Sequence, residues 1–312
     1  MTDTVAPSAE PATPAERPVL AFFCVVVGAV AMGISPIFVR LADVGPFASA
    51  FWRVALALPL LWAWAQWDSR QRKHKAPLTH AEKRRNLKLV IAAGVLFAGD
   101  LFFWHISIMN TTVANATFLA ALAPIAVVLG SWTILGEKIT SNIVLGLALG
   151  VLGAGFLLGS SYKFAPEHLT GDIYGMITAL FFGAYFLAVR PARRHMPAGV
   201  VIFRSSLVTA AVLLVVALSL EDTVLPASLH GLAMLLCLAF VSHAGGQGLL
   251  AFALGHLPAA FSSIVILIEG VAAAVFGWII LGEHLTLLQL TGSLAIFAGI
   301  FFARPRRAKA LP

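Results

Sequence analysis

Residues 114–155 read ANATFLAALAPIAVVLGSWTILGEKITSNIVLGLALGVLGAG, and this stretch decides the fold. Two apolar runs in it are separated by the heptamer ILGEKIT at 134–140. Each run approaches the roughly 20 residues that a bilayer-spanning helix needs. The heptamer recurs as ILGEHLT at 280–286, an offset of 146 residues. The chain therefore contains two copies of a pair of apolar helices joined by a short polar turn.

The repeat extends beyond the heptamer. The further matched positions are Gly146 with Gly292, Gly153 with Gly299, FVR at 38–40 with AVR at 188–190, and Trp52-Arg53 with Phe203-Arg204. We take the repeats as 19–160 and 171–303, with five predicted helices each. An odd number of helices per repeat gives the two copies opposite orientations in the membrane. The sequence therefore predicts an inverted-topology repeat, which many secondary transporters share.

The composition of the whole chain excludes a water-soluble protein. Of its 312 residues 60% are apolar and 11% are charged, whereas an ordinary soluble domain has about 25% charged residues. The mean hydropathy is +0.92. A net charge of +7 would suit a nucleic-acid binder, but the charges are clustered, and Thr223–Ile268 has none. We therefore expect an all-α integral membrane protein.

Ten transmembrane helices are predicted from the apolar runs between charged residues and Pro or Gly breaks. They cover 19–39, 47–67, 88–109, 114–135, 142–160, 171–190, 199–219, 229–255, 259–281 and 286–303. Residues 1–18 and 304–312 remain as a flexible tail and a basic tail. Little chain is left for a soluble domain.

The orientation follows from the distribution of Lys and Arg. If the N-terminus is cytoplasmic, 17 of the 21 Lys and Arg residues fall in cytoplasmic segments, and Arg40 and Lys163 fall outside. Arg53 and Arg204 lie within helices. Cytoplasmic loops carry the excess of positive charge in membrane proteins. We predict that both termini and the 68–87 loop face the cytoplasm of a plasma membrane, such as the bacterial inner membrane.

The quoted stretch follows the pattern A-x-A-x-x-L-x-x-L-x-P, then LGE and a Gly-rich helix, and SPIFVRLADVGPFASAFWRVALALPL at 35–60 also fits. In these motifs the chain resembles the EamA type of the drug/metabolite transporter superfamily, over nearly its whole length. Within that superfamily it is similar to bacterial amino-acid exporters of the YddG kind. The second copy reads Glu269-Gly270 where the family often has Glu-Pro, which removes a proline-linked bend in the ninth helix. The resemblance implies a ten-helix, ATP-independent exporter with a central cavity.

Four charged residues fall within predicted helices, where each costs about 2.5–3.5 kcal/mol on insertion scales. Asp100 and Glu269 are near the middle of their helices. Two interpretations of Asp100 stay open. It could act in function, by binding a substrate ammonium group or by exchanging a proton, or it could act in structure, through an ion pair with Arg53 or Arg204. For Glu269 we favour a structural role, because the family often has Glu there. Arg53 and Arg204 are about two turns from helix ends, which favours snorkelling or a structural pair.

Helical spacing places other candidates for a cavity wall on two faces. One face holds Phe97, Asp100, Trp104 and Ser107, and the other holds Phe240, His243 and Gln247. We expect Asp100, Trp104, His243 and Gln247 to face one central cavity, because a lipid-facing stripe would leave polar groups unsatisfied. Pro36 and Pro124 predict kinks in the first and fourth helices, which fit either hinges or static bends.

Several chemistries have no motif in the sequence. There is no GxxxxGK[ST] motif for ATP, no metal-binding cluster, and no cofactor is predicted. Cys24 and Cys237 are expected near opposite membrane faces and hence unpaired.

The favoured function is secondary export of small metabolites, above all amino acids, by alternating access. Alternatives are export of drugs, purines or other metabolites, and, in another class, an intramembrane enzyme or a membrane scaffold. The expected partners are a small-molecule substrate and the lipid bilayer, without nucleic acid. Whether the chain is a monomer or a homodimer stays open.

Overall fold

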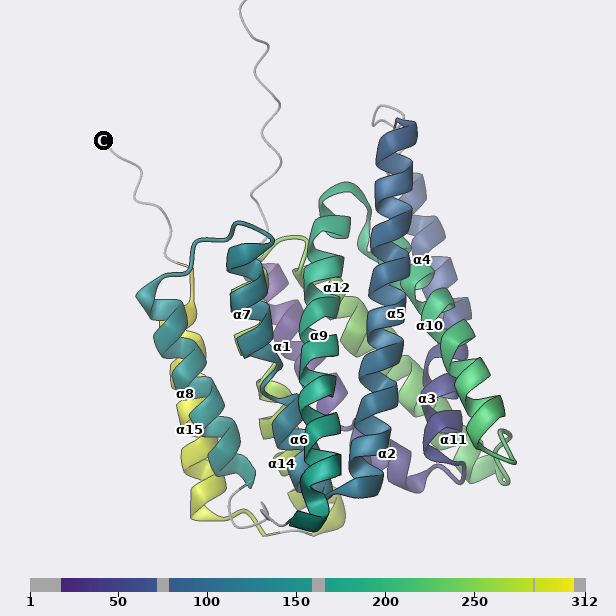
Figure 1. Ribbon diagram of the computed structural model, residues 1–312, viewed down its shortest axis with the longest axis vertical. Coiled ribbons are helices and arrows are strands. Elements are labelled where there is room, and N and C mark those ends of the chain that lie inside the picture. Colours follow the sequence, from purple (N-terminus) through teal and green to yellow (C-terminus); the bar gives the residue numbers. More distant parts are fainter. Residues whose placement is uncertain (1–17, 72–78, 159–165, 283, 306–312) are drawn as a thin grey trace, which may run out of the picture.

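A computed structural model of the chain describes residues 18–71, 79–158, 166–282 and 284–305, and all regular secondary structure in these ranges is helical (Figure 1). The α-helices are α1 (Pro18–Gly33), α2 (Ser35–Leu41), α3 (Pro46–Ala55), α4 (Leu58–Gln71), α5 (His80–Asn110), α6 (Val113–Ala120), α7 (Ala123–Thr133), α8 (Ser141–Leu158), α9 (Leu169–His195), α10 (Ala198–Leu220), α11 (Leu229–Cys237), α12 (Gly248–Ala253), α13 (Ala259–Val265), α14 (Ile268–Leu281) and α15 (Leu287–Ala303). A 3₁₀ turn, η2 (Pro166–His168), and a π-helix, η3 (Leu238–Gln247), complete the described chain. Residues 1–17, loop residues 72–78, residues 159–165 with Lys163, Glu283 and the tail from 306 on lie outside the described residues.

Nine spans in the described residues are long and apolar enough to cross a membrane. They are Pro18–Leu41, Pro46–Gln71, His80–Asn110, Asn115–Thr133, Ser141–Leu158, Pro166–His195, Ala198–Leu220, Leu229–Ala253 and Ala259–Ile280. The tenth predicted helix is α15, whose 17 residues extend about 25 Å at 1.5 Å per residue. An all-helical membrane protein is thus confirmed.

The third span begins earlier than the predicted residue 88. Helix α5 starts at His80 because Thr79 and Glu82 form a capping box. The Thr79 hydroxyl accepts from the Glu82 N–H at 3.3 Å, and the Glu82 carboxylate accepts from the Thr79 N–H at 2.8 Å. The apolar pattern gave too late a start, since the first turns of this helix are charged.

Several spans are interrupted near their middle. The first span changes from α1 to α2 at Ile34, just before Pro36, and the fourth changes from α6 to α7 at Ala121–Leu122, just before Pro124. Proline lacks the N–H of a continuous helix, which accounts for both breaks. The ninth span also breaks, at Ile266–Leu267, although no proline is present. There the backbone tightens, with the Glu269 N–H donating to the Ile266 carbonyl at 2.9 Å.

Helices α8 and α15 pack against each other along their length (Figure 1). A Cβ atom added to Gly146 would lie 2.5 Å from the Gly299 carbonyl oxygen, and one added to Gly153 would lie 2.6 Å from that of Gly292. In the other direction, a Cβ atom added to Gly292 would lie 2.6 Å from the Gly153 carbonyl oxygen. One added to Gly299 would lie 2.6 Å from the Gly146 carbonyl oxygen. The glycines that match in sequence therefore touch crosswise between two antiparallel helices.

A second crosswise contact joins the second and seventh spans. At the start of α3, the Phe47 and Ala48 N–H groups donate to the Glu221 carboxylate at 2.7 and 3.0 Å. At the start of α10, the Gly199 N–H donates to the Asp68 carboxylate at 2.8 Å. An acid at the end of each span thus caps the beginning of the other.

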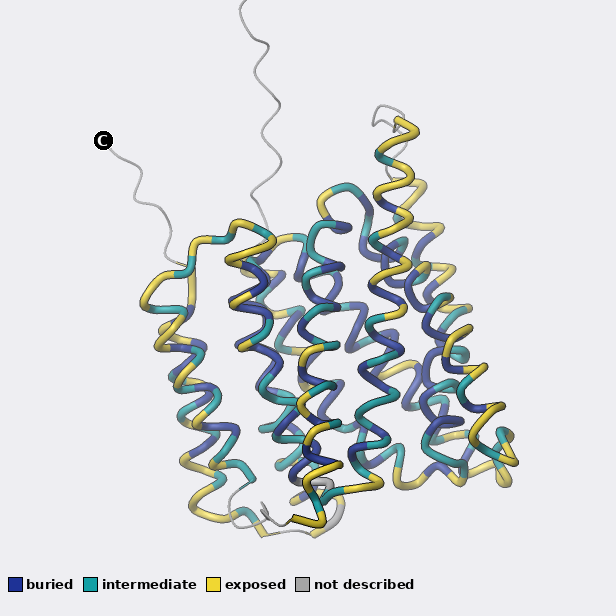
Figure 2. The backbone as a smooth tube through the Cα atoms, viewed as in Figure 1, coloured by how far each residue is buried: buried dark blue, intermediate teal, exposed yellow. Residues whose placement is uncertain are grey.

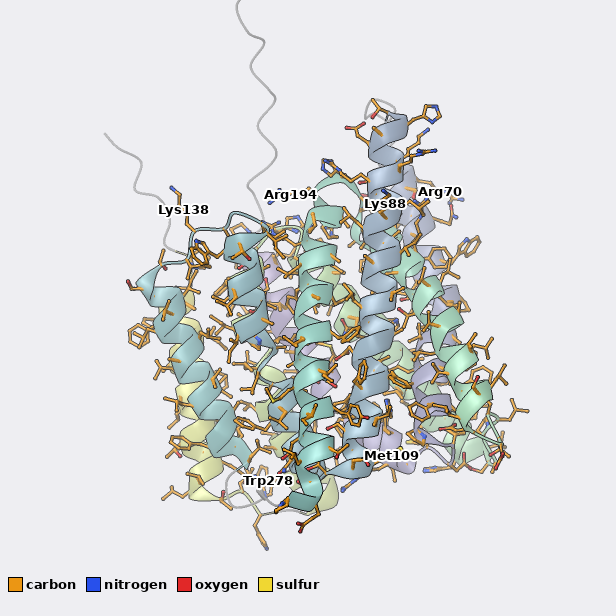
Figure 3. The ribbon with its side chains drawn as sticks, in the orientation of Figure 1. Arg70, Lys88, Met109, Lys138, Arg194 and Trp278 are labelled. Carbon is orange, nitrogen blue, oxygen red and sulfur yellow. The ribbon has the colours of Figure 1, made fainter. Side chains whose placement is uncertain are left out.

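Positively charged side chains gather at one end of the molecule. Arg70, Lys138 and Arg194 lie at this end, here called the basic end, whereas Met109 and Trp278 lie at the opposite end, here called the far end (Figure 3). Between the ends, the outer faces of the helices are exposed and apolar, as at Leu180 (61% exposed) and Val215 (65%). Figure 2 shows the buried residues on the facing sides of the helices. Lipid rather than water is the fitting solvent for such a surface.

Candidate functional site

A cavity of about 520 Å³ lies between the two halves of the chain. Its walls come from the first span (Met32 to Arg40), from α5, α6, α7, α8, α9 and α14, and from Arg53, Gln247, Ile266, Leu267 and Gln289. The α5 residues in the wall, Phe97 to Trp104, belong to the part of that helix nearer the far end. The size is within the range of about 300–1,000 Å³ that small-molecule sites occupy.

Three of the interrupted spans meet at this cavity. Gly33, Ala121 and Leu267, which lie at the breaks of the first, fourth and ninth spans, all line it. Gly33 is required there, because an added Cβ would come within 2.6 Å of the Glu269 carbonyl oxygen. Interrupted helices near the membrane midplane build the substrate sites of many transporters, because they bring backbone polar groups to a ligand.

Four charged side chains line the cavity: Arg40, which is exposed, and three that are less exposed, Arg53, Asp100 and Glu269. Arg53 is 8% exposed and Asp100 is 9% exposed. Both acids interact electrostatically with Arg53, but among the described residues none of these three forms an ion pair. The ion pair that the sequence suggested for Asp100 is therefore not formed, and Arg53 points into the cavity instead of snorkelling to a membrane surface.

Buried polar groups without a hydrogen-bond partner lie in the same wall. They are the Arg53 Nε, the Gln247 Oε1 and the Ser35 Oγ. The Gln247 side chain is anchored at its other end, because its Nε2 lies 3.2 Å from the Met32 sulfur. Unpartnered buried polar atoms are rare in folded proteins, so a cluster of them indicates a bound ligand or water.

Aromatic rings form the rest of the wall. Phe97, Trp104, Phe118 and Phe182 all line the cavity. Tyr185 supports two of them from behind, with ring centroids 5.1 Å from Phe97 and 6.2 Å from Phe182. Aromatic walls with a few convergent polar groups are typical of small-molecule sites.

The structure brings Asp100, Trp104 and Gln247 to one cavity, as expected, but not His243. The His243 Nε2 lies 2.8 Å from the Ser206 Oγ of α10, and its ring lies behind Phe97, with centroids 5.6 Å apart. Phe240 is 43% exposed on the outside of the molecule. Both expectations assumed an α-helix, whereas these residues belong to the π-helix η3, whose wider turn changes which residues share a face.

Two further candidates lie away from the cavity. Ser107 is fully buried and donates to the Gly171 carbonyl at 2.8 Å, so it joins α5 to the start of α9. Ten residues separate it from Phe97, a distance of about 15 Å along the helix axis, so Ser107 lies beyond the α5 residues that line the cavity. Arg204 is exposed, and no ion pair is described for it. The repeat match of Arg53 with Arg204 therefore does not extend to their surroundings.

Toward the basic end, Glu137, the acid of ILGEKIT, joins the turn after α7 to the start of α13 and to α9. Its carboxylate accepts from the Ala259 and Ala260 N–H groups at 3.0 and 3.3 Å, at the start of α13. It also pairs with the Arg190 Nε at 3.4 Å, and the Arg190 Nη1 donates to the Leu254 carbonyl at 2.9 Å. Sequence reasoning missed this role, although the recurrence of ILGE around an acid pointed to it.

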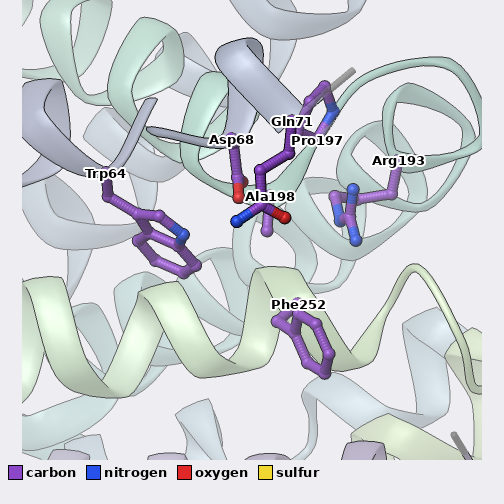
Figure 4. A pocket seen from close by; sticks show the side chains of 7 residues that line it. All are labelled: Trp64, Asp68, Gln71, Arg193, Pro197, Ala198 and Phe252. Carbon is purple, nitrogen blue, oxygen red and sulfur yellow. The ribbon is translucent and has the colours of Figure 1, made fainter. Parts of the chain in front are cut away.

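A second pocket of about 410 Å³, drawn in Figure 4, includes neighbours of Arg70 and Arg194 of the basic end among its lining residues. It is lined by Trp64, Asp68, Gln71, Arg193, Pro197, Ala198 and Phe252. Its two charged groups already have structural bonds, because Asp68 caps α10 and the Arg193 Nε donates to the Ala251 carbonyl at 2.7 Å. This pocket is therefore a weaker candidate than the central cavity.

Apolar spans around a central cavity are the arrangement of a membrane transport protein rather than of an enzyme. The chain belongs to the EamA-like transporter family, which matches residues 19–159 and 169–304. The resemblance stated from the motifs is thus confirmed.

Individual relatives agree with this assignment. The chain is 27% identical over 229 residues to a protein of Pseudomonas aeruginosa named pseudopaline exporter CntI, covering 73% of this chain and 78% of that protein. It is 28% identical over 198 residues to an uncharacterized transporter of Archaeoglobus fulgidus, covering 63% and 69%. A crystal structure with 19% sequence identity superposes with a TM-score of 0.75 and covers 92% of this chain and 96% of the other, which shows that the fold is shared.

Proposed function

We propose that this transporter is a secondary exporter of small metabolites, amino acids above all, and that it works by alternating access around the central cavity. The observation that carries the proposal is the cavity itself, which has buried charges of both signs, unpartnered polar atoms and aromatic walls. Such a lining suits a small solute with a charged head and an apolar side chain. The name of the P. aeruginosa relative, an exporter, supports the outward direction.

The architecture we propose is ten transmembrane helices in two inverted repeats, 19–160 and 171–303. The crosswise glycine contacts between α8 and α15 support it, since a contact made in both directions is what a two-fold relation produces. The crosswise caps by Asp68 and Glu221 support it independently. Superposing the repeats should require a rotation of about 180° around an axis in the membrane plane.

The transport cycle follows from which end is closed. We assign the basic end to the cytoplasm, because positive residues are retained there. The cavity then lies toward the outside, and the Glu137–Arg190 contacts close the inside. During export these contacts would open and the far end would close, so that the same cavity faces each side in turn.

Counterflow in liposomes tests the proposal. Purified protein is reconstituted into vesicles loaded with one amino acid, and uptake of the labelled amino acid is followed for a panel of side chains, without ATP. We expect counterflow of at least one amino acid in vesicles that contain the protein, and no counterflow in vesicles without it. If no amino acid exchanges while another metabolite class does, the substrate assignment is wrong, and if nothing exchanges, the transport proposal fails for these solutes.

A further inference from the structure

The charged groups of the cavity do not balance. Arg53 is one cation, whereas Asp100 and Glu269 are two acids, and no protein group among the described residues forms an ion pair with any of them. A fourth charged residue of the wall, Arg40, is exposed, so water screens its charge. With both acids ionised, the buried Arg53 and Asp100 and the half-buried Glu269 together carry one negative charge in excess.

A ligand that pairs with all three groups must carry complementary charges. Buried charges are strongly unfavourable unless they are paired, so a molecule that brings opposite charges to these groups would bind in the cavity favourably. A carboxylate matches the guanidinium of Arg53, whose planar fork binds such groups in bidentate fashion. Cationic nitrogens match Asp100 and Glu269. An amino acid with an apolar side chain has only one such nitrogen and would leave one acid unpaired.

Further groups of the wall suit a second cationic nitrogen. The Gln247 Oε1 and the Ser35 Oγ are buried acceptors without a partner, and an ammonium group has three N–H donors to satisfy. Trp104 offers an aromatic face of the kind that attracts cations. The cavity of about 520 Å³ is large enough for an amino acid with a long side chain.

We propose that the preferred substrate is an amino acid, or a metabolite derived from one, with a second cationic nitrogen: its carboxylate pairs with Arg53, and its two nitrogens pair with Asp100 and Glu269. This inference rests on the proposed function and narrows its substrate class. Lysine and ornithine have this charge pattern, leucine lacks the second nitrogen, and glutamate has the opposite charge.

The test compares lysine with leucine and glutamate in counterflow and in binding to the purified protein. We expect lysine to bind at least about tenfold more tightly than leucine, a ratio that one additional ionic contact readily supplies. Of the variants Glu269→Gln and Asp100→Asn, the one that removes the partner of the second nitrogen should reduce this ratio to about twofold or less while leucine binding changes little. The one that removes the partner of the α-nitrogen should weaken the binding of lysine and leucine alike. If neither variant lowers the ratio, the pairing of the second nitrogen with these acids is wrong. Glu167→Gln, which neutralises an exposed acid of η2, is the control and should leave the ratio unchanged.

The outcomes separate this inference from the proposed function. If leucine exchanges as well as lysine or better, the second-nitrogen inference is overturned and amino-acid export stands. If no amino acid exchanges, the proposed function fails with it. Should the Glu269 and Asp100 variants fail to fold, the ratio measured on the unaltered protein decides alone.

Discussion

The contribution of a single residue of the cavity wall to transport can be separated from its contribution to stability, and Trp104 is the clearest case. Its ring lines the cavity one helical turn beyond Asp100 along α5. The Trp104 ring also meets the His105 ring edge-on, with centroids 5.0 Å apart, and this contact within the protein restrains its orientation. A ring held in this way can contact a substrate without a large loss of side-chain entropy.

Trp104→Ala should therefore reduce transport more than it reduces stability. We expect about a fivefold to tenfold loss of counterflow, since a well-placed aromatic contact contributes about 1 to 1.4 kcal/mol. The yield of folded, monodisperse protein should stay near normal. Trp132→Ala is the matched control, because Trp132 is 62% exposed and lies outside the cavity. Equal flux in both variants would remove Trp104 from the site.

At the scale of helices, the contact between α8 and α15 depends on glycine at particular positions. A Cβ at Gly153 would approach the Gly292 carbonyl oxygen to 2.6 Å, whereas a Cβ at Gly155, on the same helix, would find its nearest neighbour at 3.7 Å in Phe118. Small residues allow helix backbones to approach closely in a membrane. The spacing of glycines in the sequence indicated such a face but did not identify its partner.

Gly153→Ala should destabilise the protein and Gly155→Ala should not. Overpacking of this kind costs about 1–3 kcal/mol, because backbone atoms must move apart. Thermal unfolding in detergent, followed by the loss of the monodisperse peak on size exclusion, measures the difference. If the two variants unfold at the same temperature, the close approach of α8 and α15 is not as described.

The Glu137 contacts connect one helix to the start of another, so they also belong to this scale. Glu137→Gln keeps the shape of the side chain but removes its charge, weakening both the pair with Arg190 and the interaction with the α13 N-terminus. We expect the population to shift toward a form open at the basic end. A cysteine at the buried Ile264, with Cys24 and Cys237 replaced by alanine, should then react several-fold faster with a thiol reagent. Lys138→Gln is the neighbouring control, and an unchanged rate in Glu137→Gln would mean that these contacts do not hold this end closed.

At the scale of the whole molecule, the segregation of charge predicts its orientation. Lys and Arg gather at the basic end, whereas Met109 and Trp278 lie at the far end (Figure 3). Translocating a positive loop is disfavoured, so the basic end should stay in the cytoplasm.

Cysteine labelling in intact cells measures this orientation. In a background without Cys24 and Cys237, a cysteine at Met109, which is 64% exposed, should react with an impermeant thiol reagent. A cysteine at Arg70 should react only after the cells are opened, since we place it in the cytoplasm. The reverse pattern would invert the map and with it the assignment of the cavity to the outside.

The sequence by itself determined that the chain is helical and spans a membrane, where most spans lie, and which family it belongs to. These properties depend on composition, on apolar run length and on motifs, which are local. It also indicated Asp100, Trp104 and Gln247, because a polar group in an apolar helix needs a partner or a cavity.

Only the tertiary structure decided which of the candidates meet. The sequence patterns assume regular helices, so the π-helix that turns His243 toward Ser206 and the break at Ile266–Leu267 could not be read from them. Nor does periodicity reveal what a helix face contacts: Arg53 and Arg204 are matched in the repeat, yet one is buried at the cavity and the other is exposed. The surroundings of a side chain depend on how distant helices pack, and helix packing in a bilayer is set by contacts over the whole molecule.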